Sequence, residues 1–336
     1  MYKKIIATII ISLVILTLGT NIAVSNHGNT YKDFSKVSHV MTNGKLKLVS
    51  NKDTYNSLAD VRIKQRYNFV NLSKPTLVAH RGASSIAPEN SIPAIDEAAK
   101  IGYWGVELDI CSSSDGTLYL LHDGMLDRTT NGHGLITTKS SHQIDRLIVN
   151  KGANISSYPD LRLPRFKDAL VECRKDNLIP VFDIKYLSEE NRDLNTFLKI
   201  IYKYGDEKKL LVHAFNYKYL EYLRSKDKQI ILMPMVDPQS IIYGYNYIKS
   251  FGFTGVDSNI DYLNKKIVQQ AHRDGLKVFC WTVDTPLELN KALNLGVDFI
   301  YSDTFYPNDI KSLKKTFNSN QHIKPVHKAS NRTYKL

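Results

Sequence analysis

The chain has 336 residues, of which 43% are apolar and 10% aromatic, and this composition supports a sizeable core and excludes a disordered chain. Its formal net charge of +12 favours a polyanionic environment, but the sequence shows no zinc-finger cysteine spacing or recognisable nucleic-acid-binding motif, so nucleic acid is not a predicted partner. The three cysteines, Cys111, Cys173 and Cys280, are odd in number and far apart, which excludes a disulfide framework.

The N-terminal segment has the layout of a secretory signal peptide. Two lysines precede an uncharged, mostly apolar run over residues 5–18, and small residues follow at 23–25. Residues 5–24 are also about long enough for an uncleaved membrane anchor, so we expect a protein that is secreted or, alternatively, anchored to the membrane. Removal of residues 1–25 takes away two lysines and no acid, which leaves a charge of 12 − 2 = +10. This excess favours an anionic cell wall or membrane surface as a neighbour.

The segments that flank the central part of the chain are polar. Residues 26–74 contain one strand-like piece at 45–49 and are predicted to form a linker. Residues 317–336 are rich in lysine and arginine and are predicted to form a basic tail. The intervening residues 75–316 are therefore the predicted folded domain.

Eight short apolar runs recur through this domain and predict strands. They lie at residues 77–80, 104–110, 179–184, 210–215, 230–235, 254–257, 277–283 and 298–302. Most are separated by segments with helical periodicity, such as 92–101, 261–275 and 285–296, the last two of which end near a glycine. A strand followed by a helix, repeated eight times over about 250 residues, is typical of an α/β fold of the (β/α)8 TIM-barrel type.

One further apolar run, at residues 117–123, does not fit this alternation. It follows the strand at 104–110 after a short polar turn, whereas a parallel crossover needs about a dozen residues or more, so we predict an antiparallel hairpin. The hairpin would place His122 beside the strand that carries Glu107 and Asp109. Because these two acids are separated by one residue, both side chains point to the same face of the strand.

Two carboxylates on one face of a barrel strand are costly unless a cation neutralises them. Salt bridges to lysines are one alternative, but the neighbouring strand residues are apolar. A divalent cation, Ca2+ or Mg2+, would satisfy both Glu107 and Asp109, because these ions prefer oxygen ligands. Asp183, near the end of the next parallel strand, is the predicted third ligand, since barrel strands end together at the C-terminal face. His80 ends the first predicted strand at that same face, and Arg81 follows it.

Six short motifs rich in histidine and acidic residues follow one another in this domain. In chain order they are His80-Arg81-Gly82, Pro88-Glu89-Asn90, Glu107-Leu108-Asp109, Asp115-Gly116, His122-Asp123 and residues 126–134. An Asp-Ile-Lys element, a Trp-Thr-Val-Asp element and a Gly-Val-Asp strand come after them. This series resembles the glycerophosphodiester phosphodiesterase family over residues 75–310. The resemblance implies a metal-dependent barrel enzyme that hydrolyses glycerol-linked phosphodiesters to glycerol 3-phosphate and an alcohol.

The resemblance also implies roles for individual residues. It makes His80 and His122 the general acid–base pair, Arg81 and Lys185 the phosphate contacts, and the two acids on the strand before the hairpin metal ligands. Phosphodiester cleavage needs one proton removed from the attacking oxygen and one given to the leaving oxygen, and two imidazoles can share these tasks near neutral pH. The resemblance leaves open whether water attacks directly or opens a cyclic phosphate formed by the substrate's own glycerol hydroxyl.

The chain departs from the family pattern at Asp183, where the family usually has a glutamate, and the shorter side chain has less reach toward a metal. The venom-type sphingomyelinase D enzymes resemble the chain at this element, but they generally lack the Pro-Glu-Asn and Arg-Thr-Thr segments. Phospholipid head-group removal is therefore an alternative activity, and a non-catalytic barrel that binds wall polymer or membrane is another. Export and positive charge favour the glycerol-phosphate polymer of a teichoic-acid-like wall component as one candidate substrate.

Two residues have alternative interpretations. Glu89 either supports the metal site or caps the helix that follows Pro88. Trp281 either lines a glycerol pocket or fills the barrel interior, and its position near a strand end favours the pocket. Structural or solvated positions are expected for four other histidines, His133, His142, His213 and His272.

Overall fold

The structure, a computed structural model, describes residues 39–42, 45–48, 75–205, 209–236, 248 and 251–310. The predicted signal segment at 1–25 and the predicted tail at 317–336 lie outside these residues, so both stay predictions. Within the described ranges, no helix is long and apolar enough to cross a membrane.

A small two-stranded ladder forms near the N-terminus. Strand β1 (His39–Thr42) pairs with strand β2 (Lys45–Leu48) in antiparallel register, with His39 opposite Leu48. It lies in a compact unit of its own, separate from the unit that begins at Tyr55. Strand β2 covers most of the strand-like piece predicted at 45–49, whereas the sequence patterns do not predict β1.

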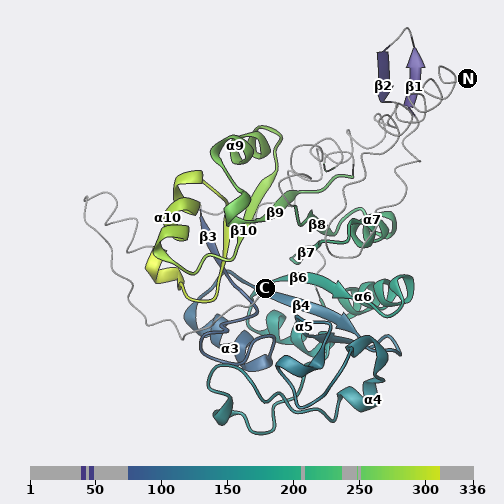
Figure 1. The fold of residues 1–336 in the computed structure, drawn as a ribbon, viewed down its shortest axis with the longest axis vertical. Coiled ribbons are helices and arrows are strands. Elements are labelled where there is room, and N and C mark those ends of the chain that lie inside the picture. The colour runs from purple at the N-terminus through teal and green to yellow at the C-terminus, as the bar shows by residue number, and fades with distance from the viewer. Residues whose placement is uncertain are drawn as a thin grey trace, which may run out of the picture. The chain divides into compact units, whose positions relative to one another are not determined.

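Eight parallel strands build the barrel in the described part of the second unit (Figure 1). In chain order they are Thr76–Ala79 (β3), Gly105–Ser112 (β4), Ile179–Tyr186 (β6), Leu211–Ala214 (β7), Ile231–Pro234 (β8), Gly255–Asn259 (β9), Lys277–Trp281 (β10) and Phe299–Ser302 (β11). Parallel pairing runs β8-β7-β6-β4-β3-β11-β10-β9. A parallel bridge between Met235 and Asp257, next to a 2.7 Å hydrogen bond from Val236 N to Asp257 O, joins the two end strands. The predicted TIM barrel is confirmed.

Helices lie in the connections between strands, on the outside of the barrel (Figure 1). The α-helices in the described ranges are Ile92–Ile101 (α3), Ser141–Ile144 (α4), Phe166–Lys175 (α5), Glu190–Tyr204 (α6), Tyr217–Lys226 (α7), Lys265–Arg273 (α9) and Pro286–Leu295 (α10). Short 3₁₀ turns are Leu126–Arg128 (η2), Ile136–Thr138 (η3), Ile155–Ser157 (η4) and Ile260–Tyr262 (η5). The three helices predicted by periodicity correspond to α3, to η5 with α9, and to α10.

Side-chain caps fix where these helices begin and end. Ser91 precedes α3 and accepts a hydrogen bond from the Ala94 backbone N–H (3.2 Å). Thr285 and Glu288 form a reciprocal capping box at the start of α10. That helix ends at Gly296, whose φ of 74° lies in the left-handed region that favours glycine.

The predicted hairpin is also present. Strand β5 (Leu118–Leu120) pairs antiparallel with β4, with Ile110 opposite Leu120. The chain after β5 folds over a small core of its own before α5 begins. That core contains Cys111, Tyr119, Leu121, Leu126, Ile136, Ile144, Val149 and Leu163. The excursion positions His122 and the loop after it at the C-terminal end of β4.

The alternation of the strands divides the main core into two parts. Val106, Leu108 and Ile110 of β4 share one cluster with residues of the surrounding helices. A second cluster comes from the residues that point into the barrel: Val78, Val181, Leu211, Ile231, Met233, Phe279, Phe299 and Tyr301. The inward positions that follow on β4, β6 and β7 are acidic residues and histidine, so the barrel interior changes from apolar to polar toward the C-terminal ends of its strands.

The three cysteines add to the packing. Cys111, Cys173 and Cys280 are all buried and unpaired, as the sequence predicted for Cys111 and Cys280. Burial raises the pKa of each thiol well above its usual range. None of them is suited to act as a nucleophile at neutral pH.

Candidate active site

The polar interior is assembled from neighbouring strands in matched register. Asp109 of β4 lies opposite Asp183 of β6, and Asp183 lies opposite His213 of β7. Glu107 lies one inward position earlier on β4, and His80 follows β3 directly. The C-terminal ends of four strands therefore bring acidic and imidazole side chains together, as the sequence predicted for the acids and for His80.

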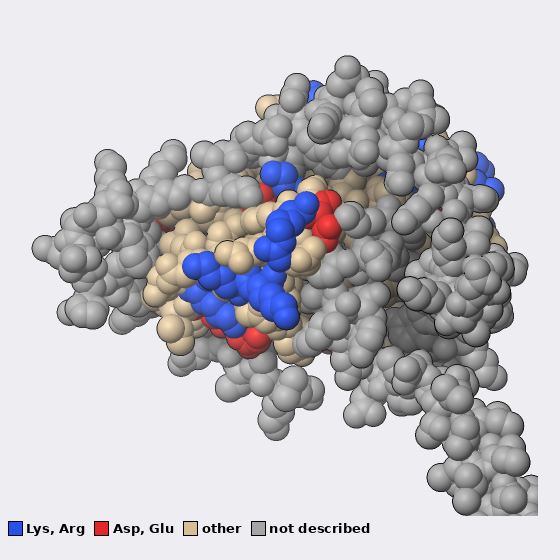
Figure 2. All heavy atoms as spheres, turned by 90° about the horizontal axis from the view of Figure 1, so that it is seen from above, with Lys and Arg blue, Asp and Glu red and all other residues tan. Residues whose placement is uncertain are grey.

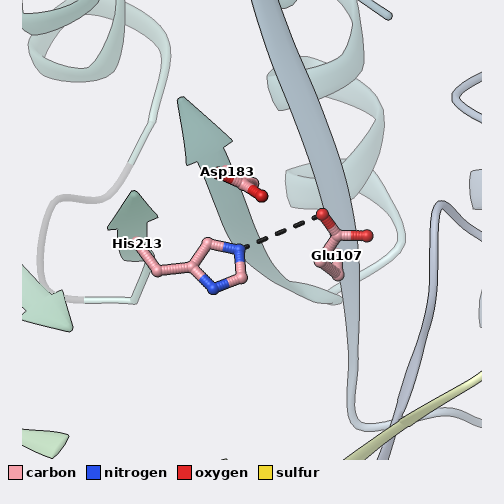
Figure 3. A group of neighbouring side chains, drawn as sticks. All are labelled: Glu107, Asp183 and His213. Atoms are coloured by element: carbon pink, nitrogen blue, oxygen red, sulfur yellow. Dashed lines mark ion pairs between the residues drawn. The ribbon is translucent and has the colours of Figure 1, made fainter. Parts of the chain in front are cut away.

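Glu107, Asp183 and His213 form a compact group of potential metal ligands among these side chains (Figure 3). One ligand atom from each residue lies within 4.8 Å of the others, and the residues are 3%, 2% and 2% exposed. Nε2 of His213 lies 4.0 Å from Oε1 of Glu107. Neither this nitrogen nor Oδ1 of Asp183 has a hydrogen-bond partner among the described residues. Buried polar atoms are rarely left unsatisfied, so the donor set fits a divalent cation.

Asp109 is neutralised by other groups. Its Oδ2 accepts a hydrogen bond from Nδ2 of Asn90 (2.7 Å), and its Oδ1 lies 3.3 Å from Nζ of Lys185. Nε of Arg81 is 3.6 Å from Oδ2. Burial by itself would raise the pKa of Asp109, but Lys185 and then Arg81 outweigh it and hold the pKa well below its usual range. The structure therefore places Asp109, a predicted metal ligand, with two cations rather than within the compact group.

Glu107 has the opposite electrostatic environment. Burial, followed by repulsion from Asp109, raises the pKa of Glu107 to about 7. Its Oε2 accepts a hydrogen bond from the backbone N–H of Arg81 (3.0 Å). Burial lowers the pKa of His213, but Asp183 and Asp257 outweigh it and raise the pKa to about 9. These groups thus shift one another's pKa, and a cation bound beside Glu107 would favour the ionised form of its carboxylate.

His80 is held in one orientation by Asp303. Nδ1 of His80 lies 2.9 Å from Oδ1 of Asp303, and because an ionised carboxylate only accepts, Nδ1 carries the proton. The other ring nitrogen, Nε2, lies 4.0 Å from Oε2 of Glu107 and faces the site. Burial lowers the pKa of His80, whereas Asp303 raises it, and the net shift is upward. Ser84 donates a 2.6 Å hydrogen bond that fixes Asp303 in turn.

His122 has the same arrangement on the hairpin excursion. Its Nδ1 lies 2.7 Å from Oδ1 of Asp123, so Nε2 is again the nitrogen that is available for chemistry. Nε of Arg128 donates to Oδ2 of Asp123 at 2.5 Å. The structure therefore places a carboxylate at Nδ1 of both predicted catalytic histidines, and Asp303 is the partner of His80 that the sequence analysis missed.

Glu89 connects the residues around His80 with those around His122 through two arginines. Its carboxylate accepts hydrogen bonds from Arg81 (3.0 Å) and from both terminal nitrogens of Arg128 (2.9 and 2.7 Å). The cap of the following helix is Ser91, so the helix-cap interpretation of Glu89 is wrong. Glu89 instead holds two guanidinium groups, that of Arg81 next to His80 and that of Arg128, which also bonds Asp123 beside His122.

The turn after β3 explains the Arg-Gly pair. Arg81 has a φ of 57° and Gly82 a φ of 83°, both in the left-handed region. A Cβ on residue 82 would lie 2.6 Å from Cβ of Ala94, so only glycine fits there. This tight turn aims the Arg81 backbone N–H at Glu107 while its side chain reaches Glu89.

Lys185 and Trp281 complete the predicted set. Nζ of Lys185 forms ion pairs with Asp183 and Asp109 and lies 5.9 Å from the centre of the Phe215 ring. Trp281 is half-buried, packs against the inner apolar cluster, and meets Phe215 edge to face at 6.0 Å. Because Phe215 is 48% exposed, Trp281 lies at the boundary between the barrel interior and the open end.

The remaining histidines divide into two groups. His133 and His142 are exposed, and His272 bonds Asp298 just before β11, at the opposite end of the strands, so these three have the structural or solvated positions that were predicted. His213 differs, because it is buried in the acidic group. Its inward position on a predicted barrel strand was the signal available in the sequence.

Comparisons with known proteins bear on the family and the fold of the chain. A family model described as the glycerophosphoryl diester phosphodiesterase family matches residues 80–305. Glycerophosphodiester phosphodiesterase 1 of Mus musculus is 46% identical over 111 residues, which are 32% of this chain and 33% of that protein. The chain thus aligns with about a third of the length of this mammalian relative.

Longer alignments come from bacteria. The glycerophosphodiester phosphodiesterase of Caldanaerobacter subterraneus subsp. tengcongensis is 26% identical over 243 residues, covering 68% of this chain and 94% of that protein. A solved Oleispira antarctica phosphodiesterase, in complex with the product sn-glycerol-3-phosphate, superposes with a TM-score of 0.66 at 24% identity and covers 72% of this chain and 97% of the other. The structural likeness supports the barrel fold.

Proposed function

The chain belongs to the glycerophosphoryl diester phosphodiesterase family, and on that premise we propose that it hydrolyses glycerophosphodiesters to glycerol 3-phosphate and an alcohol. The observation that carries the proposal is the pair of carboxylate-held histidines, His80 and His122, at the end of the barrel where Arg81 and Lys185 lie. This combination supplies two proton-transfer groups and two cations for one phosphodiester.

Each histidine is prepared for proton transfer through one nitrogen. Asp303 and Asp123 accept from Nδ1 and fix the ring orientation, which leaves Nε2 to exchange a proton with the substrate. One Nε2 accepts a proton from the attacking oxygen, and the other donates a proton to the departing alkoxide. A carboxylate partner also stabilises the imidazolium that forms during the first of these transfers.

The cations of the site bind the phosphate. Arg81 is held by Glu89 and Asp109, and Lys185 by Asp109 and Asp183, so both enter the reaction already oriented. A guanidinium and an ammonium fixed in this way stabilise negative charge on the nonbridging oxygens. Asp109 thus acts on the substrate through the two cations that it holds.

Glu107, Asp183 and His213 are the residues that would hold a divalent cation. When bound, the ion supplies Lewis-acid stabilisation of phosphoryl charge. The all-oxygen set expected from the sequence favours Ca2+ or Mg2+, whereas the grouped side chains include one imidazole nitrogen. The identity of the ion therefore depends on how His213 takes part.

The substrate class follows from the charge of the site and of the surface. The Oleispira antarctica structure holds sn-glycerol-3-phosphate, which supports the same product here. Figure 2 shows lysine and arginine side chains grouped on one described face, with acidic side chains at the border of the group. Together with the net charge of +12, this group favours an anionic substrate, including a glycerol-phosphate polymer outside the cell.

An assay with a small panel of phosphodiesters tests the proposed function. We expect glycerol 3-phosphate to be released from glycerophosphocholine, and from poly(glycerol phosphate) if the wall polymer is a substrate. Sphingomyelin should be turned over poorly. Preferred cleavage of sphingomyelin would instead support head-group removal, and polymer binding with no turnover would support a non-catalytic barrel.

A further inference from the structure

The donor group at Glu107 differs from an all-oxygen site in one respect. Its third member is the imidazole of His213, which lies beside Asp183 in register on the neighbouring strand β7 (Figure 3). Both unpartnered atoms of the group, Oδ1 of Asp183 and Nε2 of His213, belong to residues that are 2% exposed. Two independent observations, the shared position and the unsatisfied atoms, therefore indicate a ligand at this place.

The proton on His213 is located by its other neighbour. Nδ1 of His213 lies 2.5 Å from Oδ2 of Asp257, a fully buried carboxylate on β9. Because the carboxylate accepts, Nδ1 carries a proton, and Nε2 is the ring atom that an ion would bind in place of a second proton. A carboxylate behind a histidine in this way is the arrangement that orients histidine ligands and raises their basicity at metal sites.

The distances allow one ion to be shared. Two ligand atoms that each lie about 2.1 Å from one ion are about 3–4 Å apart. The three donor atoms lie within 4.8 Å of one another, and Nε2 of His213 is 4.0 Å from Glu107. Small side-chain adjustments would bring all three to bonding distance.

The carboxylate of Asp109 is the other oxygen donor near Glu107, and it is already bonded to neighbouring side chains. Both oxygens of Asp109 have partners among Asn90, Lys185 and Arg81, whereas Asp183 pairs with Lys185 through Oδ2 and keeps Oδ1 without a hydrogen-bond partner. Asp183 is one methylene shorter than a glutamate. The group of Glu107, Asp183 and His213 therefore offers an ion two carboxylates and one nitrogen donor, which is fewer protein oxygens than Ca2+ prefers.

We propose that Nε2 of His213 is a direct metal ligand and that, through it, the site selects a divalent transition metal ion such as Mn2+ or Zn2+ over Mg2+ and Ca2+. Imidazole nitrogen suits transition metals, whereas Mg2+ and Ca2+ favour oxygen. The inference concerns metal selectivity and goes beyond the proposed hydrolysis. Its readouts are binding and spectroscopy, so its failure would leave the phosphodiesterase proposal intact.

Spectroscopy on the unaltered protein gives the first test. The full chain is stripped of metal with a chelator, loaded with one equivalent of Mn2+, and measured by pulsed electron paramagnetic resonance. The expected spectrum contains coupling to an imidazole nitrogen. A spectrum without nitrogen coupling would overturn the proposal, because His213 would then be paired only with protein carboxylates.

Variants give the second test through metal affinity. Asp257→Asn, which keeps the ligand and removes its support, should weaken Mn2+ binding by about 10–100-fold. His213→Gln should weaken it at least as much, abolish the nitrogen coupling, and change Mg2+ affinity far less. His272→Gln is the matched control, since His272 also bonds a buried carboxylate, Asp298, but lies at the other end of the strands.

The ratio of Mg2+ to Mn2+ dissociation constants decides between the outcomes. We expect His213→Gln to lower this ratio toward 1 and His272→Gln to leave it unchanged. If His213→Gln keeps the wild-type ratio, the selectivity does not come from His213 and the proposal fails. Should His213→Gln not fold, the nitrogen coupling in the unaltered protein and the Asp257→Asn affinity still decide the question.

Discussion

His80→Ala and His122→Ala are each expected to lower kcat by about 10²–10⁴-fold, because each removes one of two proton-transfer groups. The double variant should lose little more than the worse single variant, since either imidazole is ineffective without the other. Steady-state release of glycerol 3-phosphate from glycerophosphocholine measures the effect, and circular dichroism checks the fold.

His142→Ala is the matched control for this pair. His142 is exposed and bonds Arg146 at the surface, away from the site, so its loss should change stability little and leave kcat within about 2-fold of wild type. Losses that multiply in the His80, His122 double variant would indicate separate roles. Single losses no larger than that of His142→Ala would remove both residues from the chemistry.

Glu107→Gln is expected to abolish metal-dependent turnover and most of the stabilisation that a bound ion gives. The substitution keeps the volume and one oxygen, but removes the charge that an ion requires. Without metal, the variant should be at least as stable as wild type, because burial and Asp109 already disfavour the Glu107 carboxylate and raise its pKa to about 7. Calorimetry with and without Mn2+ measures both effects through Tm.

Glu190→Gln provides the corresponding control. Glu190 is exposed in the first turn of α6 and is outside the site, so the metal-induced rise in Tm should persist there. A rise of wild-type size in Glu107→Gln would show that the ion binds elsewhere. The same conclusion would follow if chelator-treated wild type kept full turnover.

Local patterns were sufficient to predict the barrel. Each strand is a short apolar run that can be predicted without knowing which strand it pairs with. Helix α3 lies at the residues that periodicity predicts, 92–101. The hairpin of β4 and β5 followed from chain length alone, because so short a connection cannot cross to a parallel neighbour. Strand β1 lacked such a pattern and was not predicted.

The part of the site that could be predicted consists of residues that lie close together in the sequence. Glu107 and Asp109 share a face because of strand geometry, and His122 follows the hairpin. Asp303 could not be predicted as the partner of His80, because 223 positions separate the two residues and only barrel closure brings them together. The same holds for Asp257 behind His213 and for the arginine pair around Glu89.

The different electrostatic environments of Asp109 and Glu107 also could not be predicted from the sequence. Asp109 and Glu107 are chemically alike and nearly adjacent, yet one is neutralised by Lys185 and Arg81 while the other lies with Asp183 and His213. Which carboxylate is left for an ion depends on side-chain directions across three strands. Only the assembled barrel determines those directions.

The most direct test of the central claim is the fate of water oxygen during turnover of glycerophosphocholine. The reaction is run in water enriched in the heavy oxygen isotope, and the products are identified by mass spectrometry and phosphorus NMR. Hydrolysis at this site predicts glycerol 3-phosphate with one heavy oxygen on phosphorus and unlabelled choline, and loss of both products in His80→Ala. Label in the choline, or a cyclic phosphate that accumulates with no glycerol 3-phosphate, would contradict the account.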